Sequence, residues 1–218
     1  PFYLMVFLAF IVGSVFIFFY IKNEKKLKIS FMLELLMVLI VSGVIVGFIL
    51  PEVFDGNYSS LRSIIITTLI AFFYVWIRKE NFRYLDVIAL FVPLFLSIAR
   101  ITCFLEWHCH GIETNLPWGI VVGGALPVHP TQIYLSLINI CLFIIIYNLR
   151  KSIFFTKIKG NMVFTYLASY SFLRLVLIEP IRYGVGTSDG FLRSSLLLLM
   201  FIVSSMLILI RNRNFYVK

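Results

Sequence analysis

The stretch Ser194-Ser-Leu-Leu-Leu-Leu-Met-Phe-Ile-Val-Ser-Ser-Met-Leu-Ile-Leu-Ile210 is followed directly by Arg211-Asn-Arg213. A continuous apolar run of this length is typical of a helix that crosses a lipid bilayer, because a helix satisfies its own backbone hydrogen bonds. The whole chain shares this character: 61% of its residues are hydrophobic and 13% are charged, whereas a soluble domain carries about 25% charged residues. The composition excludes a soluble globular protein and predicts an all-α polytopic membrane protein.

Similar apolar runs occur along the rest of the chain, separated by short charged breaks or by breaks that contain Gly and Pro. They predict about seven transmembrane helices, over residues 2–21, 29–50, 63–77, 85–104, 130–149, 162–178 and 194–210. These spans leave no room for a soluble domain, so we expect a single membrane-embedded domain over residues 1–218. Because the chain begins at Pro1 without a Met, we also expect a short N-terminal segment to precede it.

Basic residues are distributed unevenly among the loops. Fourteen of the 19 Lys and Arg residues lie in the first, third and fifth loops and in the C-terminal tail, whereas the second and fourth loops, residues 51–60 and 105–129, hold none. Because loops rich in Lys and Arg stay in the cytoplasm, we predict that the N-terminus lies outside and the C-terminus inside. The net charge of +9 then reflects membrane topology, and no nucleic-acid partner is expected.

Five arginines depart from this distribution and fall within the spans or near their outer ends: Arg62, Arg100, Arg174, Arg182 and Arg193. Side chains that reach the outer headgroups explain Arg62 and Arg193. Arg100 and Arg174 lie deeper, where an arginine costs at least about 2.5 kcal/mol unless it faces a polar cavity. We therefore predict a cavity in the outer half of the bundle, and the guanidinium fork favours a phosphate as its ligand.

The fourth loop, residues 105–129, is the most polar and irregular segment, and it contains two tryptophans, which favour membrane interfaces. Its end, His129-Pro130, places a proline in the first turn of the fifth span, where the missing N–H costs nothing. His129, Gln132 and Tyr134 are therefore predicted to line the outer end of that span.

The same loop contains His108-Cys109-His110. Adjacent side chains rarely converge on one ion, and the spacing matches no zinc pattern, so we expect neither a metal nor a cofactor. Cys103 and Cys109 lie near the predicted outer face, and the sequence leaves open whether they form a disulfide.

Three blocks of sequence carry most of these polar residues. They are Ala99-Arg-Ile-Thr-Cys-Phe104 through Gly111 with the downstream Leu116-Pro-Trp-Gly119, His129-Pro-Thr-Gln-Ile-Tyr134, and Leu173-Arg-Leu-Val-Leu-Ile-Glu-Pro-Ile-Arg182. In order, spacing and topology, over nearly the whole chain, they resemble the signature blocks of the prolipoprotein diacylglyceryl transferases of bacterial inner membranes. The opening Tyr3-Leu-Met is similar to the end of that family's first-helix motif.

This resemblance implies an enzyme that transfers a diacylglyceryl group from phosphatidylglycerol to the lipobox cysteine thiol of a prolipoprotein, with release of glycerol phosphate. It implies as catalytic residues Arg100, which would bind the phosphate, and Arg174 with its partner Glu179, which would polarise the leaving group. The residues implied to position the substrate are Tyr3, Gly111, His129, Gln132, Tyr134 and Arg182.

The chain departs from the family pattern at two places that concern the chemistry. The family's His-Gly-Gly segment at the start of the third span is absent, and no histidine precedes His108. The thiol base therefore stays open between His110, His129 and the arginine field alone. The family's Arg and Glu are four residues apart, whereas Arg174 and Glu179 are five apart. In an ideal helix this turns Glu179 by about 100°, and a kink at Pro180 would restore the pairing.

The resemblance and the topology together predict the localisation and the partners of this protein. We expect a monomeric multi-pass protein of the bacterial plasma (inner) membrane, with phosphatidylglycerol, prolipoprotein signal peptides and membrane lipid as its partners. A family member with a changed acceptor, or an inactive one that binds anionic phospholipid, stays open as an alternative. A small transporter is disfavoured because the charges gather at one face and the spans show no inverted repeat.

Overall fold

The computed structural model describes residues 2–22, 27–46, 60–124, 126–184 and 188–216 of the chain. Seven long helical segments run through the described residues. They are α1 (Phe2–Lys22), α2 (Ile29–Val44), α4 (Ser60–Ile77), α5 (Arg83–Leu105), α6 (Thr131–Leu149), the continuous segment α8 (Asn161–Leu173), η2 (Arg174–Ile178) and α9 (Glu179–Tyr183), and α10 (Ser188–Tyr216). A short helix α7 (Ile153–Lys157) and two strands, β1 (Ile120–Val121) and β2 (Pro127–Val128), lie in the loops. The predicted all-α fold is confirmed.

The helix ends differ modestly from the predicted spans. Helix α4 begins at Ser60, three residues before the predicted start, and α10 extends at both ends, to Ser188 and Tyr216. Pro130 is the residue before α6 and not its first helical residue. Helix α2 ends at Val44, and residues 47–50 of the second predicted span lie outside the described part, as do residues 51–59 of the second loop. Apolar runs locate the spans well, but they do not fix where a helix continues past the apolar stretch.

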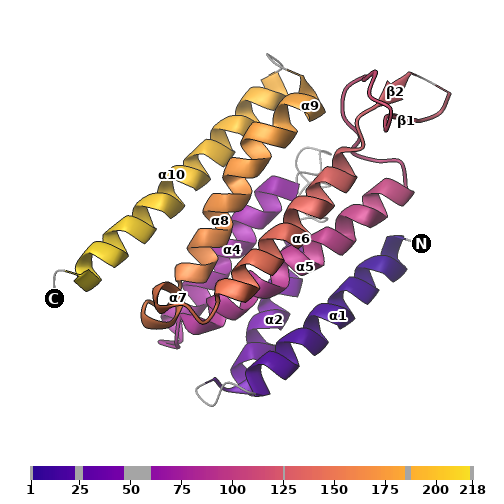
Figure 1. Ribbon diagram of the computed structural model, residues 1–218. Coiled ribbons are helices and arrows are strands. Elements are labelled where there is room, and N and C mark those ends of the chain that lie inside the picture. Colours follow the sequence, from indigo (N-terminus) through magenta and orange to yellow (C-terminus); the bar gives the residue numbers. More distant parts are fainter. Residues whose placement is uncertain (1, 23–26, 47–59, 125, 185–187, 217–218) are drawn as a thin grey trace.

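Within the described residues, four helical segments are long and apolar enough to cross a membrane, and shorter apolar helices accompany them. Helix α5 lies at the centre and packs against α1, α6 and α8 (Figure 1). Helix α10 packs mainly on α8, and only 11% of its apolar window is buried, against 61% for Asn161–Tyr183. An apolar helix with so little burial requires an apolar solvent, and this arrangement is that of a membrane protein.

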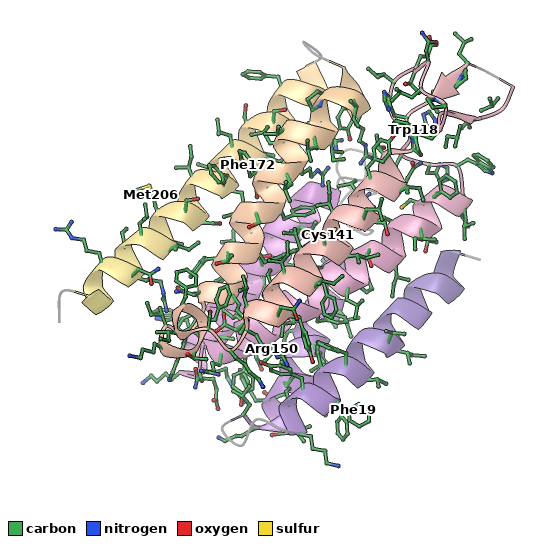
Figure 2. The ribbon with its side chains drawn as sticks, viewed as in Figure 1. Phe19, Trp118, Cys141, Arg150, Phe172 and Met206 are labelled. Carbon is green, nitrogen blue, oxygen red and sulfur yellow. The ribbon has the colours of Figure 1, made fainter. Side chains whose placement is uncertain are left out.

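The basic loops gather at one end of the bundle. Arg83 donates a hydrogen bond to the Thr156 carbonyl at 2.8 Å, and Arg211 at the end of α10 donates one to the Lys159 carbonyl. Arg150 lies at this end, whereas Trp118 and the strand pair lie at the other (Figure 2). The two chain termini point to opposite ends (Figure 1), as an odd number of spans requires. The positions of the basic residues therefore agree with the topology predicted from their count.

At the basic end, Asp86 of α5 is almost fully buried and caps helix α8. Its carboxylate accepts hydrogen bonds from the backbone N–H groups of Gly160, Met162 and Val163 at 2.7, 3.0 and 3.4 Å. The first N–H groups of a helix lack intrahelical partners, and a negative charge there also suits the helix dipole. This contact anchors the start of α8 at the basic end of the bundle.

Candidate active site

The deepest charged contact joins Arg174 and Glu179, whose side chains are 0% and 2% exposed. Arg174 Nε lies 2.8 Å from Glu179 Oε1. The two residues face each other because η2 is a single π-helical turn, in which the Glu179 N–H bonds to the Arg174 carbonyl five residues back. A π-turn absorbs one extra residue, and Pro180 has no N–H to lose when the register changes. Because the π-turn accommodates the extra residue, Arg174 and Glu179 pair although they are five residues apart.

Tyr170, one turn before Arg174 on α8, is also part of this group. Arg174 Nη1 donates a hydrogen bond to the Tyr170 hydroxyl at 3.0 Å. The guanidinium of Arg100, which comes from α5 and is 6% exposed, interacts with the same hydroxyl. Two arginines from different helices therefore meet at one phenol oxygen, and the short distance between like charges favours an anion beside them.

This group retains hydrogen-bonding capacity that the described residues do not use. Arg174 Nη2, Glu179 Oε2 and Arg182 Nη1 are buried, and none of the three atoms has a hydrogen-bond partner among the described residues. An unpaired buried donor on a charged group costs more than about 1–3 kcal/mol. Two guanidinium nitrogens in this state point to a ligand with several acceptor oxygens, such as a phosphate.

Arg182 extends the positive field from α9 towards the turn that follows α5. It donates a hydrogen bond to the thiol of Cys109 in that turn. The pKa of Cys109 lies well below its ordinary value, chiefly because the Cys103 thiol donates a hydrogen bond to its sulfur, and also because the Arg182 and Arg100 guanidinium groups stabilise the thiolate. Guanidinium groups from α5 and α9 thus favour the thiolate form of a thiol at this position, and a thiolate is the form in which a thiol acceptor attacks.

Backbone contacts hold this turn against α9 and the start of α6. The Ile112 N–H donates to the Ile181 carbonyl at 2.9 Å, and the Gly111 N–H donates to the His129 carbonyl at 2.8 Å. A Cβ on Gly111 would lie 2.3 Å from the Ile181 oxygen and 2.9 Å from His129 Cβ. Only glycine permits this approach, so Gly111 sets how closely the loop covers the arginines.

Gln132 is 1% exposed and does not line an open surface. Its amide Nε2 donates to the His108 carbonyl, and the neighbouring Thr131 hydroxyl donates to the Cys109 carbonyl at 2.6 Å. Gln132 Oε1 is buried and has no partner among the described residues. Gln132 therefore positions the turn that carries Cys109.

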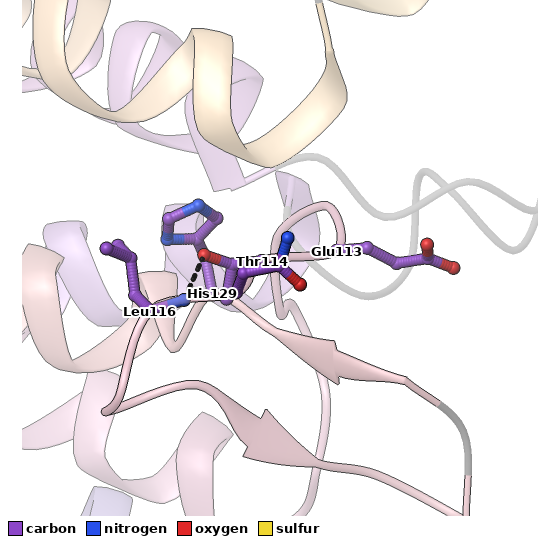
Figure 3. A pocket seen from close by; sticks show the side chains of 5 residues that line it. Glu113, Thr114, Leu116 and His129 are labelled. Atoms are coloured by element: carbon purple, nitrogen blue, oxygen red, sulfur yellow. Dashed lines mark hydrogen bonds between the residues drawn. The ribbon is translucent and has the colours of Figure 1, made fainter.

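His129 lines an open cavity of about 540 Å³ on the loop, and Tyr134 lies next to His129. The residues that line the cavity are Glu113, Thr114, Asn115, Leu116 and His129. Figure 3 shows His129 at one side of the cavity and the Leu116 N–H bonded to Thr114 Oγ1, at 3.2 Å. The Tyr134 hydroxyl accepts a hydrogen bond from Trp118 Nε1 at 2.8 Å and lies 3.4 Å from His129 Nδ1. Backbone hydrogen bonds of Gly111 to His129 and of Ile112 to Ile181 connect the loop at this cavity with α9.

The structure thus divides the residues singled out in the sequence into two neighbouring groups. Arg100, Arg174, Glu179 and Arg182 converge around Tyr170 and Cys109, whereas His129 lies at the loop cavity next to Tyr134, and Gly111 and Gln132 hold the loop between the two groups. Tyr3 lies in α1, but its side chain falls outside the described residues.

Tyr170 and the Cys103–Cys109 pair were not among the predicted site residues. The spacing of four between Tyr170 and Arg174 on one helix is the signal that would have found the tyrosine. Nothing in the local sequence pattern indicates that Cys109 returns to Arg182, because that contact joins segments far apart in the chain.

The chain is similar in sequence to proteins of one known family. The family model described as prolipoprotein diacylglyceryl transferase matches residues 2–211. The phosphatidylglycerol–prolipoprotein diacylglyceryl transferases of Clostridioides difficile and Campylobacter jejuni are 37% and 36% identical to this chain over 112 and 113 residues. That of Finegoldia magna is 28% identical over 148 residues.

These alignments cover 50%, 50% and 66% of this chain and 43%, 40% and 58% of the three relatives. The chain therefore spans about half the length of the curated relatives that it matches. The family model nevertheless extends over nearly the whole chain, including every block that forms the arginine group. The chain belongs to the prolipoprotein diacylglyceryl transferase family.

Proposed function

We propose that this protein transfers the diacylglyceryl group of phosphatidylglycerol to the lipobox cysteine of a prolipoprotein in the plasma membrane of a bacterium. The observation that carries the proposal is the buried arginine group, in which Arg174 Nη2 and Arg182 Nη1 lack a partner among the described residues. The phosphate of an anionic lipid offers the oxygens that these nitrogens need.

In this reaction the acceptor thiolate attacks the glycerol carbon that bears the phosphate ester. The new S–C bond forms as the C–O bond breaks, and glycerol phosphate leaves with the electron pair. Negative charge grows on the ester oxygen, so fixed donors nearby stabilise the transition state more than the bound lipid. Arg100 and Arg174 are placed to do so, and Glu179 with Tyr170 holds the Arg174 guanidinium in position.

The acceptor thiol must lose its proton before it attacks. The lowered pKa of Cys109, to which the Arg182 and Arg100 guanidinium groups contribute beside the Cys103 thiol, supports a role for these arginines in stabilising the acceptor thiolate, in place of the histidine that this chain lacks at the third span. His129 lines the loop cavity next to Tyr134, a position suited to the polar part of the headgroup or to the peptide backbone of the acceptor.

The test is complementation combined with a direct assay. In cells depleted of their own transferase, the protein should restore lipidation of a reporter lipoprotein. Purified protein should transfer label from phosphatidylglycerol to a lipobox peptide. Normal membrane expression without lipidation in either assay would contradict the proposal. Retained binding of phosphatidylglycerol without transfer would identify a lipid-binding family member instead.

A further inference from the structure

The turn that follows α5 holds two cysteines against each other. Cys103 lies in the last turn of α5, and the His108 N–H bonds back to the Cys103 carbonyl at 3.0 Å. Trp107 and Cys109 both have a positive φ, of 57° and 66°. Residues other than glycine pay for this conformation, so the surrounding contacts enforce it. In this turn the Cys109 sulfur comes within hydrogen-bonding reach of the Cys103 thiol.

The contacts that enforce the turn come from α6. Thr131 bonds to the Cys109 carbonyl and Gln132 bonds to the His108 carbonyl. Both cysteines are free thiols and both are partly exposed. The pair is therefore built into the fold and remains within reach of a small reagent.

The charged groups around the pair distinguish its two sulfurs. Cys109 receives a hydrogen bond from Arg182 of α9 and one from the Cys103 thiol, and Arg100 of α5 adds positive field. Cys103 lies in the field of the same two arginines but lacks the hydrogen bond from Arg182, so this hydrogen bond is what distinguishes the two sulfurs. A thiolate is the nucleophile in exchange with disulfides, and neighbouring arginines favour it. Cys109 is thus the attacking sulfur and Cys103 the one positioned to follow.

We propose that Cys103 and Cys109 form a redox-active dithiol that exchanges with disulfides. The Cys109 thiolate attacks one sulfur of a disulfide RS–SR, an S–S bond forms, and one RS⁻ leaves. Cys103 then loses its proton to the released thiolate and attacks Cys109, and the second RS⁻ leaves with the electron pair. The dithiol is oxidised to a disulfide, and RS–SR is reduced to one RSH and one RS⁻. The predicted topology places this turn at the outer face, where protein disulfides form and persist.

Oxidation of the Cys103–Cys109 pair should change how strongly the arginine group binds an anionic lipid. This expectation rests on the proposed function. The disulfide removes a negative charge that the reduced pair holds beside Arg182 and Arg100. The guanidinium groups then have one anion fewer in their field, so the oxidised protein should bind the phosphate of an anionic lipid more tightly than the reduced one.

The first test measures exchange with dipyridyl disulfide, using the full-length chain in lipid nanodiscs. The test variant is Cys141→Ser, because Cys141 is an exposed third thiol on α6. The matched reference carries Ser at all three cysteine positions together with Asn115→Cys, an ordinary thiol in the same loop. From pH 8 to pH 6 the reference rate should fall about 100-fold, as for a thiol of pKa about 8.5. The pair should slow by less than threefold, and an equal fall in both would overturn the proposal.

The second test counts the products of the exchange. The Cys141→Ser variant should release two equivalents of pyridinethione and lose 2 Da. Adding Cys103→Ser should stop the reaction after one equivalent and leave a stable mixed disulfide on Cys109. Adding Arg182→Gln should slow the reaction at pH 6 about tenfold. A stable adduct on the Cys141→Ser variant, with no second release, would overturn the resolving role of Cys103.

The third test links the pair to the lipid site. Oxidised and reduced Cys141→Ser protein are titrated with dihexanoyl phosphatidylglycerol, with the phosphatidylcholine analogue as the uncharged-headgroup control. The oxidised form should bind the anionic lipid three- to tenfold more tightly. Equal affinity would overturn the link to the arginines. Absence of binding in both states would contradict the proposed function, whereas the exchange measurements decide on the thiol pair independently.

Discussion

Two charged groups are buried at opposite ends of this bundle, and they are satisfied to different degrees. At the basic end, both carboxylate oxygens of Asp86 accept hydrogen bonds from backbone N–H groups of α8. At the other end, Arg174 and Glu179 pair through one contact, while Arg174 Nη2 and Glu179 Oε2 have no partner among the described residues. The first group is complete within the protein, and the second is not.

This difference separates a structural role from a role in binding. A buried charge whose partners are all backbone groups stabilises the fold and leaves nothing for a ligand to use. A buried charge with unused donors costs free energy until a ligand supplies the acceptors. Substitutions at the two ends should therefore affect different measurements, activity at one end and stability at the other.

The largest effect is expected for Arg174→Ala. Loss of a fixed donor to the developing charge should lower the transferase rate about 100- to 1,000-fold, measured as label transferred from phosphatidylglycerol per molecule of folded protein. Arg174→Lys is the matched control, because it retains the charge but not the fork that reaches Glu179 and Tyr170 together. It should recover only part of the rate.

Asp86→Ala should mainly lower stability. Three backbone N–H groups at the start of α8 would lose their acceptor, at a cost of about 2–4 kcal/mol of the free energy of unfolding. A denaturant or thermal titration in detergent measures this loss. Asp86→Asn, which retains one acceptor oxygen, should lose less. The activity per folded molecule should stay within twofold of the parent, and a fall as large as that of Arg174→Ala would contradict the division between the two ends.

The charged residues at the arginine end could be predicted from the sequence, whereas the role of Asp86 at the basic end could not. Five arginines outside the basic loops indicated a phosphate-binding cavity, and the family blocks added Glu179 and Gly111. The role of Asp86 was not anticipated, because its partners are backbone groups 74 to 77 residues away. Side-chain type predicts chemistry, but backbone partners across the bundle emerge only when the helices are placed.

The contacts of the thiol pair and the presence of the π-turn could not be predicted from the sequence for a similar reason. Cys103 and Cys109 were recognised as neighbours in the chain, whereas the contact with Arg182 depends on the approach of α9 at Gly111. The ideal-helix argument put Glu179 about 100° from its partner. The structure forms the pair because helical hydrogen bonding changes register locally, which periodicity of the apolar residues cannot reveal.

Gly111→Ala should have an intermediate effect. The added Cβ would lie 2.3 Å from the Ile181 backbone oxygen, so the loop must move away from α9, and overpacking of this kind costs about 1–3 kcal/mol. We expect transfer to fall about tenfold as the turn above Arg182 shifts. Gly43→Ala is the control, since a Cβ on Gly43 meets nothing within 4 Å. Equal activity of both variants would show that the close approach is not needed.

The deletion of Val176 from the π-turn should change the transfer rate only slightly, although it removes a whole residue from a helix at the site. Val176 is 52% exposed and belongs to the five residues of η2. Its removal leaves Arg174 and Glu179 four residues apart, the spacing at which α-helical side chains face each other. The turn should revert to an α-helix, and α9 should keep its position, because a π-turn is one residue inserted into an α-helix. Transfer should stay within about threefold of the parent rate.

The control for this variant is the deletion of Ala168 in the regular part of α8. There the missing residue has no π-turn to absorb it, so every later side chain rotates by about 100°. Tyr170 and Arg174 would then turn away from Arg100 of α5 together, and activity should be lost. If both deletions abolish transfer at equal expression, the π-turn has a role of its own at the site beyond aligning Glu179 with Arg174. If only the deletion within the turn is tolerated, the arginine group depends on where Glu179 points and not on the helical form that directs it there.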